Sequence, residues 1–156
     1  ADPKPGVTMH RSALVLCLVA SPLWAETPAG LLPYTDATAI KSGQAIYQAQ
    51  CAACHGADLE GERNWRDRDT EGYLPAPPHD ETGHTWHHPD TQLFMITKHG
   101  TEAIVGNDYK SNMMGFGDIL SDQEILEVLA YIKSTWPRRV VATHNRINQD
   151  AMGAAN

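Results

Sequence analysis

Residues 51–55 of the chain read Cys-Ala-Ala-Cys-His, which places two cysteines and a histidine within five positions. Two thiols at this spacing can form thioether bonds with the two vinyl groups of one haem. The histidine that follows directly then lies against the iron as an axial ligand. The stretch therefore predicts one covalently bound haem c, attached through Cys51 and Cys54, with His55 as an iron ligand.

Two closely spaced cysteines can also form a disulfide, half of a zinc site or a thioredoxin-like redox pair. A zinc site would need a second pair of ligands at a matching spacing, but no cysteine follows Cys54 in this sequence. A redox pair should follow a strand in a β-α-β pattern, whereas a helical pattern precedes Cys51. The spacing therefore favours covalent haem.

The length and composition are those of a small globular protein with extensions. The 156 residues, 42% hydrophobic and 7% aromatic, allow one domain of about 100 residues plus extensions. A bound haem would supply part of its core. No apolar run approaches the ~20 residues that a membrane-spanning helix needs, so we expect no membrane span.

The first 25 residues have the pattern of a targeting segment. Residues 9–25 combine a basic start, a short apolar core and a small-residue end, as secretory signal peptides do. We expect Ala25 to be the last residue removed, and Cys17, inside the apolar core, to be removed as well. Residues 1–8 precede the first methionine, and we interpret them as an added remnant or a mis-set start.

The mature chain would be strongly acidic. The whole chain has 12 basic and 19 acidic residues, and residues 1–25 contain two of the basic and one of the acidic ones. Their removal leaves a net charge of −8. Such a charge disfavours binding to nucleic acid or to an anionic membrane surface, and it would steer the protein toward a partner with a basic docking face.

The mature sequence starts with a leader and a helix that runs into the cysteines. Residues 26–36 are short and rich in Pro and Gly, and we expect a flexible leader. Asp36 is a good N-cap for a helix over residues 37–50, whose apolar positions recur three and four apart. Gly43, in the middle of this helix, would permit the close approach of another helix.

Capping signals predict two further helices. One begins with Pro89 in its first turn and stops at Gly100. The other opens with a capping box at Ser121 and Glu124, carries a clear apolar stripe and ends before Pro137. Three main helices are therefore expected.

The segments between and after these helices lack a clear period. Residues 56–78 form a long charged loop, and a loop of this length needs something to fold over, such as the edge of a haem. Residues 101–117 form a second irregular segment. Residues 137–156 are a polar C-terminal extension, in which one weakly amphipathic helix is as plausible as none.

Three groups of residues resemble the class I c-type cytochromes over about residues 37–136. They are Gly43-x-x-Ile46-Tyr47 before Cys51-x-x-Cys54-His55-Gly56, then Met113-Met114-Gly115-Phe116, then Leu120-Ser121-Asp122-x-Glu124-Ile125 leading to Ala130-Tyr131-Ile132. The resemblance implies an all-α class I cytochrome c fold, with three main helices and long loops wrapped around one covalent haem. It also implies that Gly43 meets Tyr131 where the first and last helices cross.

The same resemblance implies further haem contacts. The second axial ligand of the family lies in a Met-Pro-x-Phe motif, which places it at Met113; the adjacent Met114 is the alternative. Phe116, from the same motif, is also expected to contact the haem. The family uses a proline carbonyl to accept the free N–H of the axial histidine, and Pro77 is our choice among the three prolines Pro75, Pro77 and Pro78.

Four histidines, His79, His84, His87 and His88, fall within ten residues. Imidazoles beside carboxylates would suit a second metal such as copper or zinc. Their spacing matches no standard zinc pattern. We therefore favour the interpretation that Trp86 covers the haem edge, that one or two imidazoles reach a propionate and that the others lie on the surface.

These features lead to one functional hypothesis with two alternatives. We expect a periplasmic monohaem cytochrome, monomeric and not an enzyme, that carries single electrons between redox proteins. With His55 and Met113 both on the iron, no position would be open for oxygen or peroxide. The alternatives are a copper-handling haem protein that uses the histidine cluster and a ligand-binding or peroxidatic haem protein in which Met113 is displaced.

Overall fold

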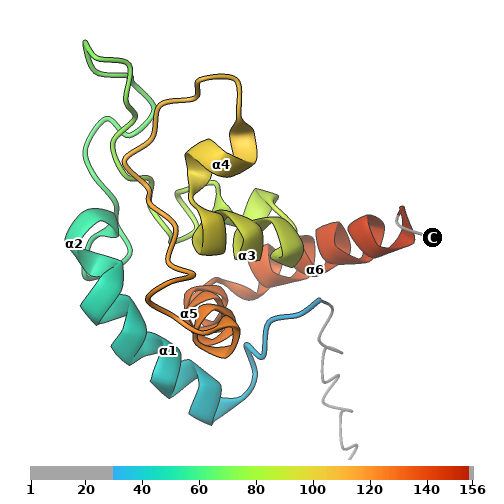
Figure 1. Ribbon diagram of the computed structural model, residues 1–156. Helices are drawn as coiled ribbons and strands as arrows, with labels where there is room; N and C mark the ends of the chain where they lie inside the picture. Colours follow the sequence, from blue (N-terminus) through green and yellow to red (C-terminus); the bar gives the residue numbers. More distant parts are fainter. Residues whose placement is uncertain (1–29, 155–156) are drawn as a thin grey trace, which may run out of the picture.

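The computed structural model describes residues 30–154. The predicted signal peptide, residues 1–8 and the first four residues of the leader lie outside this part of the chain. The helices are α1 (Ala37–Gln50), α2 (Ala52–His55), α3 (Asp90–His99), α4 (Thr101–Val105), α5 (Asp122–Ser134) and α6 (Arg138–Gly153), with one 3-10 turn, η1 (Thr85–His87). The described residues contain no β-strand, which confirms the predicted all-α class (Figure 1).

The crossing of α1 and α5 is the tightest helix contact in the fold. Asp36 caps α1 by accepting hydrogen bonds from the backbone N–H groups of Thr38 and Ala39. Gly43 is buried, and a Cβ atom built on it would overlap the carbonyl oxygen of Glu127 and lie 3.0 Å from Cβ of Tyr131. The predicted meeting of Gly43 with Tyr131 is therefore confirmed, and it explains why the position has no side chain.

α5 lies at the centre of the molecule, between α1 on one side and α3 with α6 on the other (Figure 1). The predicted capping box at its start is present, because Ser121 Oγ accepts from the backbone of Glu124 and the Glu124 carboxylate accepts from the backbone of Ser121. The apolar stripe is buried as expected. It consists of Ile125, Val128, Leu129 and Ile132.

Two long loops follow α2 and α4 and extend from the same side of the helices (Figure 1). They lie against each other at one point, where Lys110 Nζ donates to the carbonyl oxygen of Glu71 over 2.7 Å. The two irregular segments that the sequence predicts are therefore neighbours in space, and the second one carries the methionine pair.

Two segments differ from the sequence-based expectation. The leader was expected to be flexible, but from Gly30 onward it is packed: Leu32 and Tyr34 are buried, and the Asp90 carboxylate accepts hydrogen bonds from the backbone N–H groups of Leu31 and Leu32. Residues 101–105, expected to be irregular, form the short helix α4.

The C-terminal extension, for which a helix was as plausible as none, forms α6, a fourth long helix beside the three predicted ones. This helix buries Val140 and Val141 together with the polar His144, Asn145 and Asn148. Its inner face is therefore partly polar, which weakens the apolar period in the sequence.

Candidate haem-binding site

The two cysteines lie at the junction of α1 and α2. Cys51 ends α1, with its backbone N–H donating to Tyr47 O over 2.9 Å, and Cys54 lies in the single turn of α2. Both thiols are free, with Cys51 half-buried and Cys54 exposed. Burial, and to a lesser extent Cys54, raises the pKa of the Cys51 thiol to about 11. The turn therefore presents two uncommitted thiols, the groups that thioether attachment requires.

His55 is held with one ring nitrogen engaged by the protein. Its Nδ1 lies 2.8 Å from the carbonyl oxygen of Pro77, so of the three candidate prolines it is Pro77 that approaches the imidazole. Burial lowers the pKa of His55, although the Pro77 carbonyl opposes that shift. A neutral ring that donates from Nδ1 carries its lone pair on Nε2, the arrangement found in metal-bound histidines.

The backbone around His55 is fixed from α1. The Tyr47 hydroxyl donates to the carbonyl oxygens of His55 and Gly56, over 3.3 and 3.0 Å. The Tyr47 ring also contacts Tyr131 of α5, with ring centroids 5.5 Å apart. The predicted axial histidine is thus tied directly to the crossing of α1 and α5.

His79 lies against the axial histidine, and sequence reasoning did not foresee this. The two rings are stacked, with centroids 4.0 Å apart and an interplanar angle of 29°. Burial, together with the neighbouring His55, lowers the pKa of His79 well below its ordinary value. The sequence offered one signal for this contact, namely that His79 directly follows Pro77 and Pro78. On sequence alone, His79 was grouped with the other three histidines instead.

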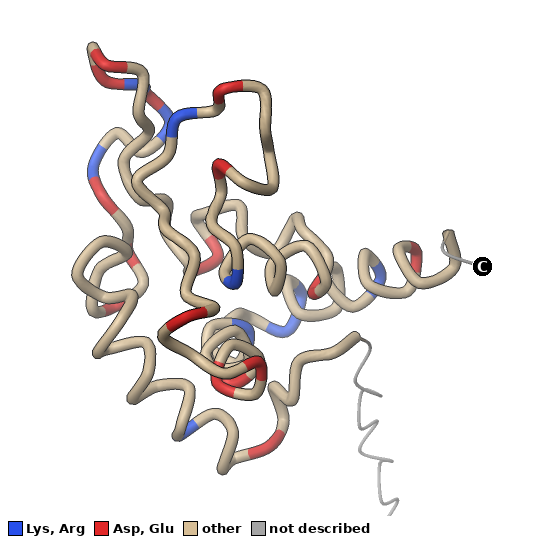
Figure 2. The backbone as a smooth tube through the Cα atoms, viewed as in Figure 1, with Lys and Arg blue, Asp and Glu red and all other residues tan. Residues whose placement is uncertain are grey.

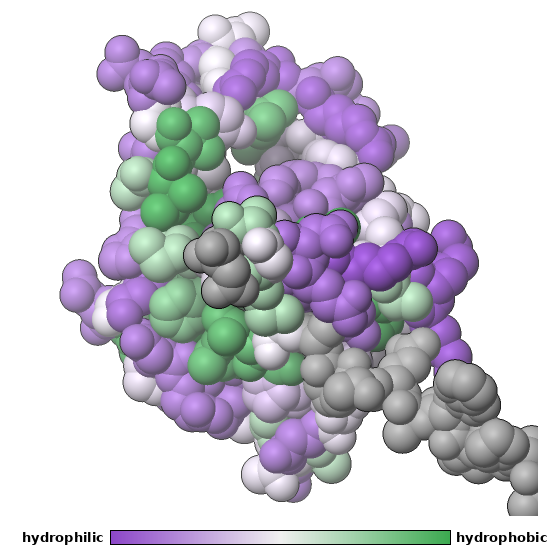
Figure 3. Space-filling model, turned by 90° about the vertical axis from the view of Figure 1, so that its right-hand side faces the viewer, coloured by the Kyte–Doolittle hydropathy of each residue, from purple (hydrophilic) through white to green (hydrophobic). Residues whose placement is uncertain are grey.

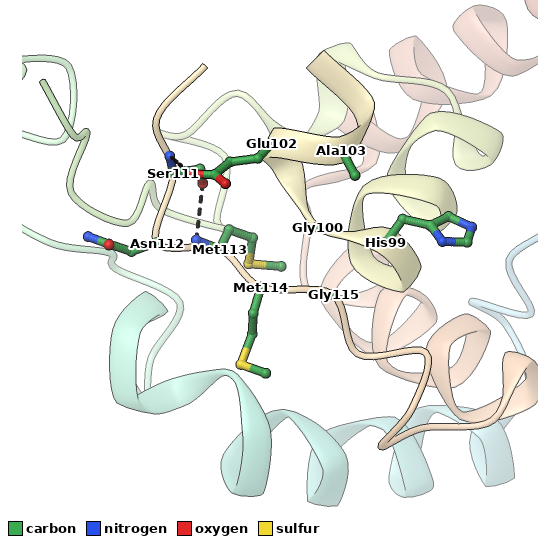
Figure 4. Close-up of a pocket in the computed structure, with 9 residues that line it drawn as sticks. All are labelled: His99, Gly100, Glu102, Ala103, Ser111, Asn112, Met113, Met114 and Gly115. Atoms are coloured by element: carbon green, nitrogen blue, oxygen red, sulfur yellow. Dashed lines mark hydrogen bonds between the residues drawn. The ribbon is translucent and has the colours of Figure 1, made fainter. Parts of the chain in front are cut away.

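The methionine pair lies on a segment that is attached by its backbone to the junction of α3 and α4 (Figure 4). Gly100 and Met114 form an isolated antiparallel bridge, Thr101 N donates to Met113 O over 3.2 Å, and Phe116 N donates to Thr97 O over 2.9 Å. The Met113 N–H donates in turn to Ser111 Oγ over 3.0 Å. These bonds fix the position from which Met113 projects.

The two methionines differ in exposure. Met113 is partly buried and packs against the core, whereas the Met114 side chain is 58% exposed. Figure 4 shows the two side chains leaving the segment in different directions, beside a cavity of ≈ 590 Å³ between this segment and α4. Phe116 is buried in the same core. Of the two, Met113 has the environment that a buried thioether ligand would need.

The histidines of the cluster contact different partners. His84 stacks on Trp65 and lies edge-on to His88, and His87 stacks on Trp86 with centroids 3.8 Å apart. Within residues 30–154, no group of three or more His, Cys, Asp or Glu side chains is arranged to hold a metal ion. Trp86 is half-buried against the core and donates from Nε1 to Glu81 O over 3.3 Å.

The donor set fits a covalently bound haem. Two free thiols lie one turn apart, the following imidazole has Nδ1 occupied by a carbonyl, and a partly buried thioether lies on the segment that passes between α2 and α3 (Figure 1). Such a combination would hold iron between nitrogen and sulfur. Among the helices described here, none is long and apolar enough to cross a membrane.

Comparison with known proteins agrees with this site. The cytochrome c family model matches residues 40–136. Relatives include the FixP subunits of cbb3-type cytochrome c oxidases of Sinorhizobium medicae (strain WSM419), 23% identical over 103 residues, and of Azorhizobium caulinodans, 26% identical over 92 residues. The matches cover 65% and 59% of this chain but 32% and 28% of the relatives, so the chain spans about a third of their length. No solved structure gave a significant match. Because the family model covers more than half of the sequence and includes both the thiol pair and the methionine pair, the chain belongs to the cytochrome c family.

Proposed function

We propose that this protein is a periplasmic carrier of single electrons with one haem c, attached through Cys51 and Cys54 and ligated by His55 and Met113. The observation that carries the proposal is the 2.8 Å contact between His55 Nδ1 and Pro77 O. It leaves Nε2 as the free donor of a neutral ring and sets the direction of the ring. When bound, the haem would supply a reversible one-electron couple.

The residues around the site support electron transfer rather than ligand chemistry. A His/Met pair would fill both axial positions of the iron, and a thioether ligand favours the reduced state. The Met113 backbone is held through both its N–H and its carbonyl oxygen, which fixes the point from which its thioether side chain projects. Since the described histidines form no metal cluster, nothing in this part of the chain favours the copper-handling alternative.

Haem attachment is tested by producing the full chain in cells that can mature c-type cytochromes. We expect one haem per chain, and we expect its colour to stay with the protein pellet after acid–acetone extraction. Replacing both cysteines by alanine should release the haem into the solvent. Colour that leaves the wild-type pellet would contradict the proposal.

The second ligand is tested with two adjacent variants that serve as controls for each other. Oxidised wild-type protein should show the weak near-infrared absorption of sulfur-to-iron charge transfer. Met113→Ala should abolish this band and lower the reduction potential, because the thioether favours reduced iron. Met114→Ala should retain the band, since its side chain is exposed. The reverse outcome would assign the ligand to Met114.

The partner is proposed to be a redox protein with a basic docking face. The acidic residues are distributed over most of the described elements (Figure 2), and the relatives are by name oxidase subunits, so a terminal oxidase is one partner to test. Among residues 30–154, the exposed large apolar side chains are Leu31, Met95, Val105, Met114, Ile119 and Met152. On the face seen in Figure 3, apolar surface gathers in a band on the left-hand side, and hydrophilic surface borders it.

Electrostatic steering makes this proposal measurable. The second-order rate of electron transfer should fall as salt rises, because exposed charges separated by more than the ~8 Å Debye length of physiological salt are largely screened. A rate that is flat or rises with salt would instead favour an apolar docking patch that includes Met114.

Binding of cyanide or carbon monoxide by the wild-type protein at neutral pH would support the peroxidatic alternative.

A further inference from the structure

His79 differs from the other histidines of the cluster in the residue that it contacts. Its ring is stacked on that of His55, with centroids 4.0 Å apart and an interplanar angle of 29°, and His55 is buried against the carbonyl of Pro77. The remaining histidines of the cluster contact tryptophan or one another near the surface. His79 is thus the member of the cluster that touches the axial residue itself.

His79 is held by groups from several parts of the chain. Its Nδ1 lies 2.9 Å from Oγ1 of Thr85, which is buried. The Tyr47 ring lies edge-on to the His79 ring, with centroids 6.1 Å apart. The His79 backbone N–H donates to Leu59 O over 2.8 Å, and its carbonyl oxygen accepts a hydrogen bond from Trp136 Nε1 over 2.7 Å. The backbone is therefore held at both polar groups, and the ring is held at Nδ1 and against Tyr47.

Trp136 extends this support to the C-terminal helix. The indole is buried and lies edge-on to the His144 ring of α6, with centroids 5.1 Å apart. His144 in turn contacts the carbonyl oxygen of His88 through Nε2 over 2.9 Å. A chain of contacts thus joins α6, which lies beyond the family match, to the face of the axial imidazole.

One hydrogen bond leaves the orientation of an imidazole incompletely defined. The contact from Nδ1 to Pro77 O fixes one point of the ring, but the ring can still tilt about the line that joins these two atoms. A flat ring that is stacked on its face, and is itself held by Thr85 and Tyr47, opposes that tilt. Groups beyond the ligand shell set ligand orientation and tune the metal in this way. We infer that His79 is a positioning residue that fixes the plane of the axial His55 ring.

This inference rests on the proposed function, since it assigns His79 a role toward a haem ligand. The plane of an axial imidazole decides which d orbitals of ferric iron it overlaps, and hence how unpaired spin is distributed over the haem. The hyperfine-shifted haem methyl resonances and the g-values of the ferric protein report that plane. If His79 only filled space in the core, its replacement would change stability but would leave the haem methyl resonances and the g-values unchanged.

The experiment uses the full chain with its haem attached, and wild-type attachment and the near-infrared band are measured first. His79→Leu removes the ring, and we expect it to shift the haem methyl resonances, the g-values and the reduction potential. His79→Phe restores a flat ring and should return the methyl pattern toward that of the wild type. His84→Leu is the matched control, because His84 is exposed and stacks on Trp65; it should leave the methyl pattern and the g-values unchanged.

The outcomes separate this inference from the proposed function. If the wild type binds no covalent haem, both fail. If the haem and the sulfur band are intact but His79→Leu leaves the methyl pattern and the g-values unchanged, only the role of His79 is overturned. An equal shift in His84→Leu would overturn it too. Should His79→Leu not fold, Thr85→Val removes the anchor of the ring, and an unchanged methyl pattern in that variant would equally refute the inference.

Discussion

α5 packs against its neighbours by two different kinds of chemistry. On the α1 side the contact is close and fitted by shape: the α1 backbone at Gly43 lies directly on Glu127 and Tyr131, and a hydrogen bond from Ser42 Oγ to Glu127 Oε2 crosses it. On the α6 side the contact is polar, since Lys133 is 0% exposed and its Nζ donates to Asn145 Oδ1 over 2.8 Å. The same helix therefore depends on shape on one side and on hydrogen-bond partners on the other.

The polar side is a network that joins the leader, α3, α5 and α6. Lys133 Nζ lies 4.2 Å from the centre of the Tyr34 ring, and Asn148 Nδ2 donates to Asp90 Oδ1 over 3.0 Å. His144 Nε2 lies 3.4 Å from the same oxygen. Burial, and then the charge of Lys133, lowers the pKa of His144, so this contact joins a carboxylate to a neutral imidazole.

The change in chemistry coincides with the end of the family match at residue 136. A crossing that is fitted by shape needs only side chains of matching volume, so different sets of residues can stabilise it. A buried polar network stabilises only when each member finds its partner, because an unpaired buried group costs the full desolvation penalty. Removing one partner on the α6 side should therefore lower the free energy of unfolding more than a change on the α1 side does. The contribution of the α6 side to stability should also depend on pH.

The largest effect is expected from Asp90→Ala. The carboxylate is 1% exposed and accepts from Leu31 N, Leu32 N and Asn148 Nδ2, so its removal leaves several buried donors without an acceptor. Loss of one member of a buried charged network costs about 3–5 kcal/mol. Denaturant unfolding of the haem-loaded protein, followed by far-UV circular dichroism, would measure this loss.

Asp122→Ala is the matched control for that variant. Asp122 is the first residue of α5, as Asp90 is of α3, but its side chain is 62% exposed and pairs with Lys98 at the surface. Exposed pairs contribute up to about 1 kcal/mol. If the two variants lose equal stability, the buried network is not what anchors α6 and the leader.

A smaller loss is expected when the apolar side is overfilled. In Gly43→Val the new side chain would meet the carbonyl of Glu127, and overpacking of a close contact costs about 1–3 kcal/mol. Ala45→Val, on an exposed position of the same helix, introduces the same side chain without the overlap. The difference between the two free energies of unfolding isolates the crossing, and a difference near zero would show that the helices can separate at little cost.

The two sides of α5 also mark how far sequence reasoning reaches. The crossing at Gly43, the capping box at Ser121 and the pair of thiols followed by an imidazole were all predictable, because helix periodicity, capping and the Cys-x-x-Cys-His spacing are local signals. The choice of Pro77 among three prolines came from family resemblance and agrees with the contact to His55. What is local in sequence, or shared by the family, could be anticipated.

The buried network and the contact of His79 with His55 could not be anticipated. Asp90 and Asn148 are 58 positions apart in sequence. α6 buries the polar His144, Asn145 and Asn148 beside Val140 and Val141, so apolar periodicity marks only part of its inner face. His79 was hidden in a cluster of similar residues, although its ring points at His55 and those of its neighbours do not. A polar side chain is buried only where a partner, often distant in sequence, satisfies its hydrogen bonds.

The pH dependence of stability gives the finest comparison of the two sides. Burial lowers the pKa of Lys133 to about 8, although Asp90 opposes the shift; an unfolded lysine has a pKa of about 10.4. Between these values the unfolded chain binds more protons than the folded one, so the free energy of unfolding should rise with pH, by about 1–2 kcal/mol from pH 8 to about pH 10. Lys133→Met removes the titrating group, and its stability profile should lack that rise.

Tyr47, whose pKa burial raises, makes stability fall with pH instead. It is present in both proteins, so its effect cancels in the difference between their profiles. Parallel profiles for the two proteins would mean that Lys133 titrates as an ordinary lysine and that the α6 side is not the pH-sensitive one.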